Sequence, residues 1–324
     1  MIDSMATSSL SSVHAKGILV TGGAGFIGSQ LVERLIALGN CVVVVDNLST
    51  GKKSYVPKEA KLVKLDTGRD HKGLHKLVRA LRPSVVYHLA AQKDLRWSVA
   101  HPLEDAKTNI LGTLHLLDAV RDAGGGRVIF TSTAAVYPPG AHLPTREEDV
   151  EIPDTPYGIS KRTAEMYLAH FASLYPMACV SLRFSNVYGP RQNLQSAGVM
   201  KQMIDALLHD RTFVINGSGE QTRDFIFVDD VVDALVRAMH VSWCGELNIS
   251  TQTEVSVNTL WKMAQELVGV ERAADFADAK EGDVFQSCLD ASQAGHVLGW
   301  SAKTHLRAGL EKTIAWERAQ EATS

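Results

Sequence analysis

The sequence predicts a doubly wound α/β fold, in which helices cover both faces of a parallel sheet, followed by a smaller, mostly helical C-terminal lobe. Six short runs rich in β-branched residues alternate with longer stretches of helical periodicity between residues 17 and 185. This alternation is typical of parallel strands that are buried on both faces. A glycine-rich turn joins the first run to the first helical stretch, and the alternation ends after Ser185. Right-handed crossovers fold such a pattern into an open layered sheet rather than a barrel.

The individual elements follow from hydrophobic periodicity and from turn residues. We expect strands at residues 18–20, 41–46, 61–65, 85–89, 127–131 and 178–183. We expect helices between them at residues 26–38, 71–81, 103–122 and 157–174. Beyond a loop at residues 186–198 that is rich in Gly, Pro, Asn and Gln, the pattern predicts a helix at 199–209 and strands at 212–215 and 224–228, and from about residue 251 mostly helix.

This order predicts two domains built from non-contiguous segments. Residues 16–184 together with 224–250 form the sheet domain, and residues 185–223 together with 251–324 form a lobe over the carboxyl edge of the sheet. Residues 1–15 are rich in Ser and Thr and have no apolar core. They are expected to be a disordered tail rather than a signal segment.

Composition excludes several classes of protein. The 324 residues contain 33 Lys and Arg against 36 Asp and Glu, a formal charge of −3, and this near-neutral balance argues against nucleic acid as the main partner. The four cysteines, at positions 41, 179, 244 and 288, have no zinc-like spacing, so we expect a reducing compartment and no metal site. No stretch approaches the roughly 18 apolar residues that a membrane span requires. We therefore expect a cytoplasmic protein.

The glycine-rich turn predicts a dinucleotide site. Thr21 to Gly28 read TGGAGFIG directly after the first strand and open the first helix, where glycines let the backbone approach a pyrophosphate and the helix N-terminus offers free N–H groups. Asp46 ends the second strand eighteen residues beyond Gly28 and could accept hydrogen bonds from both ribose hydroxyls. A carboxylate there would repel a 2′-phosphate, so NAD is favoured over NADP, although Lys52 and Lys53 lie nearby.

Two further segments belong to the same crevice by their position at strand ends. Asp66, just past the third strand, could accept from the adenine amino group. Leu89, Ala90, Ala91 and Gln92 end the fourth strand with mostly small side chains, over which a cofactor could lie. A solvated loop acid and ordinary helix packing are the alternative interpretations of these two segments.

Tyr157 and Lys161 form the candidate reactive pair. They lie four residues apart at the start of a predicted helix and so share one face. Lowering the pKa of a phenol from about 10 to about 7 requires roughly 4 kcal/mol, which an adjacent ammonium and a nicotinium ring could supply. Thr133 follows the fifth strand and could place a hydroxyl beside Tyr157 to orient a substrate alcohol. Together these residues predict a hydride-transfer site on a Rossmann sheet.

From about residue 16 to residue 316 the chain resembles an extended short-chain dehydrogenase/reductase of the nucleotide-sugar epimerase and dehydratase family, most closely the UDP-glucose 4-epimerase-like branch. Eight segments carry the resemblance in order: TGGAGFIG at 21–28, VDNLSTG at 45–51, HLAAQ at 88–92, TSTAAVY at 131–137, YGISK at 157–161, RFSNVYGPRQ at 183–192, GSGEQTRDFIFVDD at 217–230 and EGD at 281–283.

The resemblance implies NAD-dependent 4-epimerisation of a UDP-sugar. Tyr157 would be the base, Lys161 would lower its pKa and hold the nicotinamide ribose, and Thr133 would occupy the usual Ser/Thr position. The expected cofactor-binding residues are Gly22, Gly25, Phe26, Ile27, Asp46, Asn47, Ser49, Thr50, Gly51, Asp66, Thr67, Leu89, Ala90, Ala91, Gln92, Thr131, Tyr157 and Lys161. The expected substrate-binding residues are Lys93, Thr133, Asn186, Val199, Val214, Ile215, Asn216, Arg223, Lys280, Asp283 and Ser287.

Similar proteins form homodimers through the two helices at residues 103–122 and 157–174, so a homodimer is expected here. Within the substrate-binding set, Asn186 and Arg223 match positions that hold the diphosphate, and residues 214–216 match the segment that cradles the base. In similar epimerases the position of Ser287 lies beside carbon 2 of the sugar, and a Tyr there excludes acetamido sugars. A serine therefore predicts room for an acetamido group.

The chain departs from the family pattern in three places. Lys280 replaces the arginine of the RxGD signature, which keeps the charge and loses the bidentate fork. Asn216 stands where an aromatic residue is frequent. Ala134 and Ala135 stand where the 4,6-dehydratases carry an Asp-Glu pair and the decarboxylases a nearby Glu, and without such an acid the elimination of water is disfavoured.

Three alternatives remain at this stage. Lys93 and Arg96 are cations that could meet a uronate carboxylate, which makes UDP-glucuronate 4-epimerisation the main rival. A nucleotide-sugar 4-ketoreductase would consume its cofactor, whereas an epimerase would not. A non-catalytic NAD-binding sensor would have no need for Thr133, Tyr157 and Lys161 together.

Overall fold

The computed structural model describes residues 17–194, 198–279 and 284–322. The tail expected at residues 1–15 lies outside them. The chain divides into two compact units: the first holds the residues up to Ser132, Thr155–Leu182 and Leu235–Glu246, and the second holds Thr133–Asp154, Arg183–Ala234 and Leu247–Ser324. The domain boundaries predicted from the sequence differ from this division, because β6 and β10 each contribute residues to both units. The predicted boundaries stay a prediction.

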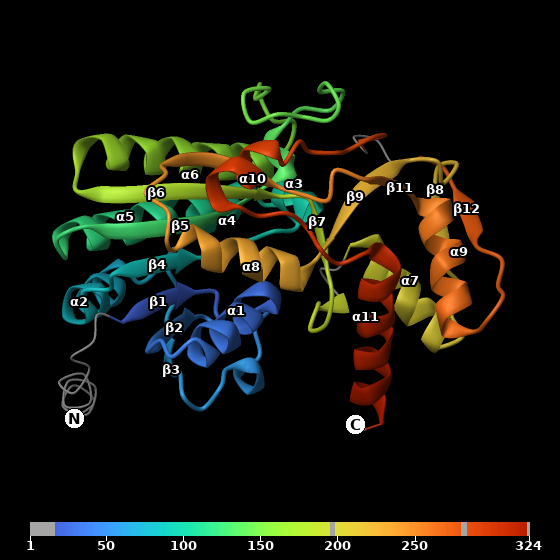
Figure 1. Cartoon of the computed structure of the whole chain (residues 1–324), viewed down its shortest axis with the longest axis horizontal. Helices are drawn as coiled ribbons and strands as arrows, with labels where there is room; N and C mark the ends of the chain where they lie inside the picture. Colours follow the sequence, from blue (N-terminus) through green and yellow to red (C-terminus); the bar gives the residue numbers. More distant parts are fainter. Residues whose placement is uncertain (1–16, 195–197, 280–283, 323–324) are drawn as a thin grey trace. The chain divides into compact units, whose positions relative to one another are not determined.

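The central element is a seven-stranded sheet with the order β10-β6-β5-β4-β1-β2-β3 (Figure 1). The strand pairs β1–β2, β1–β4, β2–β3 and β4–β5 are parallel. Chain order reverses between β1 and β4, and in such sheets a ligand crevice lies beyond the carboxyl ends of these strands. The predicted doubly wound α/β class is confirmed. The strands are β1 Ile18–Thr21, β2 Val42–Asp46, β3 Lys61–Lys64, β4 Val85–His88, β5 Gly126–Thr133, β6 Met177–Phe184 and β10 Gly245–Ile249.

The sequence pattern predicted six of these strands, and β10 is the addition. Apolar side chains fill the space between the sheet and the helices α2, α5 and α6, and Leu19, Val86 and Phe130 are among those that are fully buried. The helices that carry first-unit residues are α1 Phe26–Ala37, α2 His71–Leu81, α3 Leu95–Ala100, α4 Pro102–Ala106, α5 Gly112–Asp122, α6 Pro156–Leu174 and α8 Val228–Ala238, which continues from the second unit.

The helix expected at residues 103–122 is present as one continuous helical run that contains a π turn. Two helical segments, α4 and α5, are joined there by a π-helical turn at Lys107–Leu111. The short helix α3 precedes them and was not expected, because its six residues are too few to show a period. It ends before Pro102, which cannot donate a backbone hydrogen bond and therefore suits the first turn of α4.

The second unit contains two small sheets and several helices. One sheet has the order β11-β9-β7 and the other pairs β12 with β8. The loop expected at residues 186–198 contains a short strand, β7, and the strand expected at 224–228 is β9 of this separate sheet. Its elements are β7 Asn186–Tyr188, α7 Val199–Leu208, β8 Val214–Asn216, β9 Thr222–Phe227, β11 Glu254–Ser256, α9 Val257–Val268, β12 Asp275–Ala277, α10 Ser292–Leu298 and α11 Leu306–Glu321.

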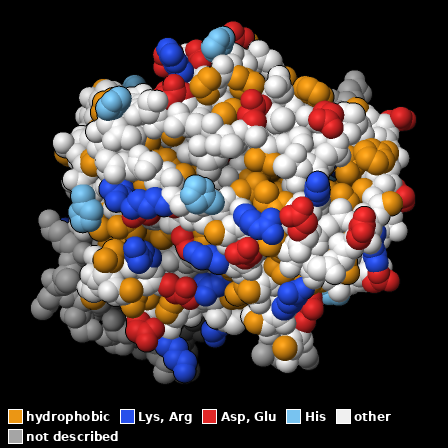
Figure 2. Space-filling model, turned by 45° about the vertical axis from the view of Figure 1, so that its right-hand side comes forward, with side chains coloured by type: hydrophobic (Ala, Val, Ile, Leu, Met, Phe, Trp, Pro, Cys, Tyr) orange, Lys and Arg blue, Asp and Glu red, His pale blue; other side chains and the backbone are white. Residues whose placement is uncertain are grey.

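Two surface properties bear on the expected partners. None of the helices in the described part of the chain combines the length and the apolar character needed to cross a membrane. On the face drawn in Figure 2, Lys and Arg side chains are interspersed with Asp and Glu side chains. This mixture differs from the single-sign basic surface that binds nucleic acid.

Candidate active site

The glycine-rich turn between β1 and α1 leaves a helix N-terminus open. Gly22 has φ of +71°, and a Cβ there would lie 2.7 Å from the backbone nitrogen of Ala90. A Cβ on Gly28 would lie 2.1 Å from the carbonyl oxygen of Gly22, so both positions require glycine. No side chain caps α1, and its first turn carries no acid. The first N–H groups of α1 are thus suited to a pyrophosphate, and the residues fit a bound dinucleotide.

Asp46 is held at the end of β2 by two backbone donors. Its Oδ2 accepts a hydrogen bond of 2.9 Å from the N–H of Ala24, and its Oδ1 accepts one of 2.8 Å from the N–H of Leu48. Each carboxylate oxygen has a second lone pair. The carboxylate therefore ties the glycine-rich turn to the end of β2 while it keeps the capacity to accept from ribose hydroxyls.

Asn47 and Asp66 connect the ends of β2 and β3. Asn47 Nδ2 donates to Asp66 Oδ2 at 2.9 Å, and Asn47 Oδ1 accepts from the N–H of Ser49 at 3.0 Å. Asn47, Ser49 and Thr50 are exposed, Gly51 and Asp66 are half-buried, and Thr67 is buried. The structure thus brings these predicted cofactor residues together at one edge of the sheet in the first unit.

The segment after β4 lies beside the glycine-rich turn. The N–H of Ala90 donates to Thr21 Oγ1 at 3.2 Å, and Thr21 Oγ1 also contacts Nδ1 of His88 at 2.7 Å. His88 is buried, and burial together with the charge of Lys161 lowers its pKa to about 3, so the ring is neutral at pH 7. His88 was not singled out from the sequence. Through its contact with Thr21, which accepts from the N–H of Ala90, it supports the segment at residues 89–92.

Tyr157 and Lys161 lie one turn apart near the N-terminus of α6. Their exposed fractions are only 8% and 2%. The N–H of Tyr157 donates to Ser98 Oγ at 3.1 Å, and Gly158 N donates to the capping hydroxyl of Thr155 at 3.1 Å. These contacts fix the first turn of α6. The sharing of one helix face that the spacing predicted is therefore realised in a buried environment.

Lys161 is anchored and desolvated. Its Nζ donates to the carbonyl oxygen of Thr131 at 2.7 Å and lies 4.4 Å from the centre of the Phe130 ring. Burial lowers the pKa of Lys161 to about 7, while the carboxylates of Glu165 and Asp105 act in the opposite direction. The predicted cofactor residue Thr131 thus contacts the lysine through its backbone.

The π-helical turn supplies a site residue that sequence reasoning missed. Asn109 is buried in this turn; its Oδ1 accepts from the N–H of Gln92 at 2.9 Å, and its Nδ2 donates to Ser160 Oγ at 3.0 Å. Asp105 accepts from Gln92 Nε2 and from Asn109 Nδ2. This network joins the segment after β4 to α6. A π turn is frequently found at functional sites, but its sequence has no signature of its own.

Apart from Lys93, the predicted substrate residues belong to the second unit. Thr133 ends β5, and its Oγ1 accepts from the N–H of Ala135 at 3.2 Å; its juxtaposition with Tyr157 stays a prediction. Asn186 pairs in register with Phe225 on parallel strands, and Arg223 lies two residues before Phe225. Asn186 and Arg223 therefore share one face of the three-stranded sheet, as a common ligand would require.

Residues 214–216 border a hollow of about 420 Å³ to which Val214 and Asn216 contribute. Ile215 is buried, and Val199 begins α7. Ser287 is half-buried and follows Phe285 and Gln286, which line a second hollow of about 370 Å³. The carbonyl of the next residue, Cys288, accepts from the N–H of Thr145 at 2.9 Å. Lys280 and Asp283 lie outside the described residues.

A glycine-rich turn and an acid at the carboxyl ends of β1 and β2, with a buried tyrosine–lysine pair on α6 of the same unit, define a dinucleotide-dependent enzyme that moves a hydride and a proton. Residues 18–248 match the NAD dependent epimerase/dehydratase family, and the chain belongs to that family. Membership confirms the predictions of family, of an enzyme and of NAD as cofactor.

Similar proteins span nearly the whole chain. A UDP-glucose 4-epimerase of Mycolicibacterium smegmatis is 40% identical over 309 residues, which are 93% of this chain and 98% of that protein. The structure of UDP-glucose 4-epimerase from Thermotoga maritima with UDP-glucose has a TM-score of 0.92 at 40% identity and covers 94% of this chain and 99% of that one.

Two further structures hold other sugars. UDP-N-acetylglucosamine 4-epimerase from Methanobrevibacter ruminantium, solved with UDP-N-acetylmuramic acid, has a TM-score of 0.89 at 31% identity and covers 94% of this chain and 99% of that one. MoeE5 in complex with UDP-glucuronic acid and NAD has a TM-score of 0.86 at 36% identity and the same coverage.

Proposed function

We propose that the protein is a UDP-sugar 4-epimerase that inverts carbon 4 of the sugar by transient oxidation and reduction with a retained NAD. The observation that carries this proposal is the buried pair of Tyr157 and Lys161 on α6, in the unit that also carries the nucleotide-binding turn. The similarity to UDP-glucose 4-epimerases over more than nine tenths of the chain supports the reaction class.

Bound NAD would supply the acceptor for a hydride from carbon 4 and, once reduced, the donor that gives the hydride back. The phenol oxygen of Tyr157 takes the proton of the 4-hydroxyl group and returns it. The ammonium of Lys161, held by the carbonyl of Thr131, favours the phenolate through its charge, and the hydroxyl of Thr133 orients the sugar alcohol. Ala134 and Ala135 provide no acid, so elimination of water is disfavoured.

Substrate binding is assigned mainly to residues of the second unit, with Lys93 added from the first. Asn186 and Arg223 are placed on the diphosphate, because both are donors and a guanidinium binds phosphate oxygens strongly. Residues 214–216 are placed on the base, beside the hollow that Val214 and Asn216 border. Lys93 and Val199 also belong to the proposed substrate set, as do Lys280, Asp283 and Ser287.

Substrate turnover without added cofactor tests the reaction class. The purified protein is incubated with UDP-glucose or UDP-galactose, and the sugars are separated after hydrolysis of the nucleotide. An epimerase approaches the same mixture from either side with no net change in nicotinamide absorbance. Stoichiometric reduction of added NAD(P)⁺ by these 4-hydroxy sugars, with a 4-keto sugar as the product and no epimer, would instead indicate a 4-ketoreductase running in reverse, and absence of turnover with bound NAD would favour a sensor.

UDP-glucuronate is the second candidate substrate. The position of the cation Lys93, directly after the segment at residues 89–92, favours it. Lys93 follows Gln92 directly and is exposed, with Asp94 next to it. A uronate carboxylate could pair with its ammonium. Lys93→Gln should then reduce kcat/KM for UDP-glucuronate more than for UDP-glucose, and an equal reduction for both sugars would count against this substrate.

We further propose that the protein is a homodimer. Apolar side chains are exposed on the helical segments from α3 to α6, namely Leu95, Val99, Leu103, Leu111, Ile159, Met166 and Leu174. Such a patch on a water-exposed helical face is typical of an interface. Light scattering tests this proposal, and Leu103→Glu together with Met166→Glu should produce a monomer.

We place the enzyme in the cytoplasm. Cys41 and Cys244 are exposed free thiols, and Cys179 and Cys288 are buried free thiols, a state that is typical of a reducing compartment. Fractionation of the source cells with detection of the protein tests this placement.

A further inference from the structure

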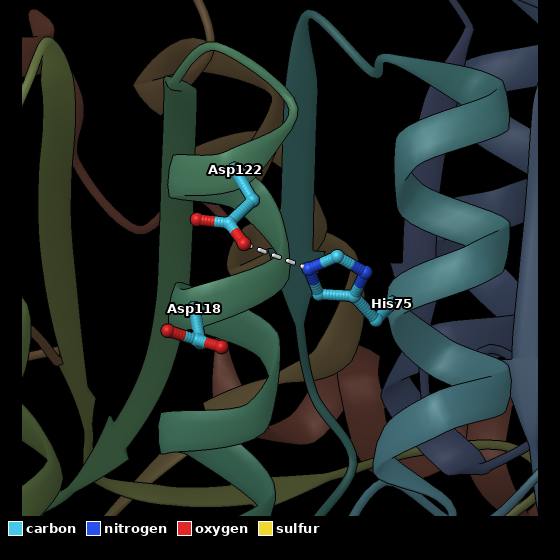
Figure 3. Close-up of side chains that lie close together, drawn as sticks. All are labelled: His75, Asp118 and Asp122. Atoms are coloured by element: carbon cyan, nitrogen blue, oxygen red, sulfur yellow. Dashed lines mark hydrogen bonds and ion pairs between the residues drawn. The ribbon is translucent and has the colours of Figure 1, made fainter.

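Two histidines on α2 and two aspartates on α5, none of them among the proposed active-site residues, face one another. His71 and His75 lie four residues apart on α2, and Asp118 and Asp122 lie four residues apart on α5. Residues four apart on a helix share one face. Figure 3 shows His75 and Asp122 directed toward each other from the two helices, with Asp118 one turn away. These four residues are called the α2–α5 cluster below.

The ligand atoms of the α2–α5 cluster lie close to metal-binding distances. His75 Nε2 lies 2.9 Å from Asp122 Oδ2, and His71 Nε2 lies 3.5 Å from Asp118 Oδ2. One ligand atom each from His75, Asp118 and Asp122 can be chosen so that all lie within 4.8 Å of one another. In a tetrahedral zinc site with bonds of 2.0–2.1 Å, neighbouring ligand atoms are about 3.3 Å apart. The three-residue group would have to contract by side-chain rotation, and His71 would join it from its place beside Asp118.

The two helices under the cluster pack against each other through buried apolar side chains. Leu74, Leu77 and Val78 of α2 are buried in the same hydrophobic core as Leu116 and Val120 of α5. These contacts fix the spacing of the two helices, so only side chains would have to move when a metal binds.

A third histidine supports His71 from one side. The ring of His115 stacks on that of His71 with 4.7 Å between centroids. Because a carbonyl only accepts, Nδ1 of His115 carries the proton in its 2.8 Å hydrogen bond to Thr67. This bond fixes the orientation of the His115 ring and thereby limits the movement of His71.

The two carboxylates already converge on a positive charge. Arg121 Nη2 lies 2.6 Å from Asp118 Oδ1 and 2.7 Å from Asp122 Oδ1. Two aspartates with one arginine leave one net negative charge when the imidazoles are neutral, which favours a divalent cation in place of the guanidinium.

We propose that His71, His75, Asp118 and Asp122 form a binding site for a divalent transition metal, Zn²⁺ first, that links α2 to α5. Two imidazoles and two carboxylates are the nitrogen and oxygen ligands that zinc takes in four-coordinate sites. Because α2 leads from β3 to β4, the bound metal stabilises the crossover at which the sheet reverses its strand order. Binding to the folded chain alone raises the unfolding temperature.

Calorimetric titration of the full-length protein with ZnCl₂, after removal of metals with EDTA, tests the site. The expected result is one Zn²⁺ per chain and an increase of several degrees in the unfolding temperature. The double variant His71→Ala/His75→Ala should lower the affinity at least tenfold, and Asp118→Asn should lower it as well. His296→Ala, which removes an exposed histidine from α10, is the matched control and should leave binding unchanged.

Arg121→Ala provides a second and independent readout. The variant removes the guanidinium that now contacts both aspartates, so Zn²⁺ should bind more tightly than to the wild type. Lys76→Ala removes an exposed charge of the same sign from α2 and should have a smaller effect. The proposal is overturned by absence of Zn²⁺ binding, by equal binding to wild type and to the double histidine variant, or by weaker binding to Arg121→Ala.

Discussion

Lys161 Nζ donates a 2.7 Å hydrogen bond to the carbonyl oxygen of Thr131, thirty residues earlier in the chain. This contact joins the helix of the candidate base to the carboxyl end of β5. The ammonium is almost completely buried and rests against the Phe130 ring. Burying this charge destabilises the folded chain. In return, the ammonium places a positive electrostatic potential near Tyr157.

The first prediction concerns pH and Lys161. Burial lowers its pKa from 10.5 to about 7 in the folded chain. Below pH 7 the folded chain therefore bears the whole cost of the buried charge. Between about pH 7 and 10.5 only the unfolded chain keeps the proton, so the cost declines as pH rises. In NAD-free protein, Lys161→Met should raise the unfolding temperature more at pH 6 than at pH 9.5.

Thermal unfolding across this pH range measures the difference between the two proteins. Lys72→Met alters an exposed lysine on α2 and should show no such trend. A Lys161→Met effect that is independent of pH would contradict a lowered pKa.

The second prediction concerns the base. Tyr157→Phe removes only the hydroxyl group, so the backbone contact of Tyr157 with Ser98 is kept. Epimerisation should become about 100 to 10,000 times slower, whereas the NAD content and the unfolding temperature stay close to those of the wild type. Initial rates with UDP-galactose measure the loss. Activity within a few-fold of the wild type would contradict the assignment of Tyr157 as the base.

The third prediction concerns the retained cofactor. Denaturation of the purified protein should release NAD rather than NADP. Asp46→Ala removes the proposed ribose acceptor and frees the N–H groups of Ala24 and Leu48. Hydrogen bonds to charged groups contribute about 1.5–3 kcal/mol, so NAD binding should weaken at least about tenfold. Chromatography of the released nucleotide measures the NAD content. Glu59→Ala is the control for loss of an exposed acid. An Asp46→Ala variant with the same NAD content as the wild type would refute the role of Asp46 in binding the ribose.

The fourth prediction concerns the sugar. Ser287 is small and half-buried, so the wild type should interconvert UDP-N-acetylglucosamine and UDP-N-acetylgalactosamine. Ser287→Tyr should reduce kcat/KM for these acetamido sugars much more than for UDP-glucose. Specificity constants for both pairs, and for UDP-glucuronate, provide the measurement. The proposed role of Ser287 in admitting acetamido sugars is wrong if these sugars are not turned over, or if Ser287→Tyr leaves their turnover unchanged.

Elements that rest on local patterns were predicted well from sequence. The six predicted strands of the large sheet and the helices α1, α2 and α6 lie close to their expected ranges, because buried parallel strands and amphipathic helices have strong periods. The strands β7 and β10 and the helices α3 and α8 were missed. Of these, β7 and α3 are short, and β7 pairs with β9 in parallel register.

Within the candidate site, the same distinction holds for individual residues. The glycine-rich turn, Asp46 and the four-residue spacing of Tyr157 and Lys161 are visible in the sequence, because each depends on neighbours within one turn or one strand. The roles of Asn109 and His88 depend on segments that lie 17 and 67 residues away. No local preference encodes such contacts.

The sequence by itself determined the fold class, the family and the cofactor, since these depend on periodicity and on short motifs that specify their own backbone geometry. Only the tertiary structure decided which carbonyl anchors Lys161, which turn brings Asn109 to Gln92, and that His75 meets Asp122 across 47 residues. Such pairings arise when distant elements pack their apolar faces together, and the polar groups at their edges then meet because the backbones are already fixed.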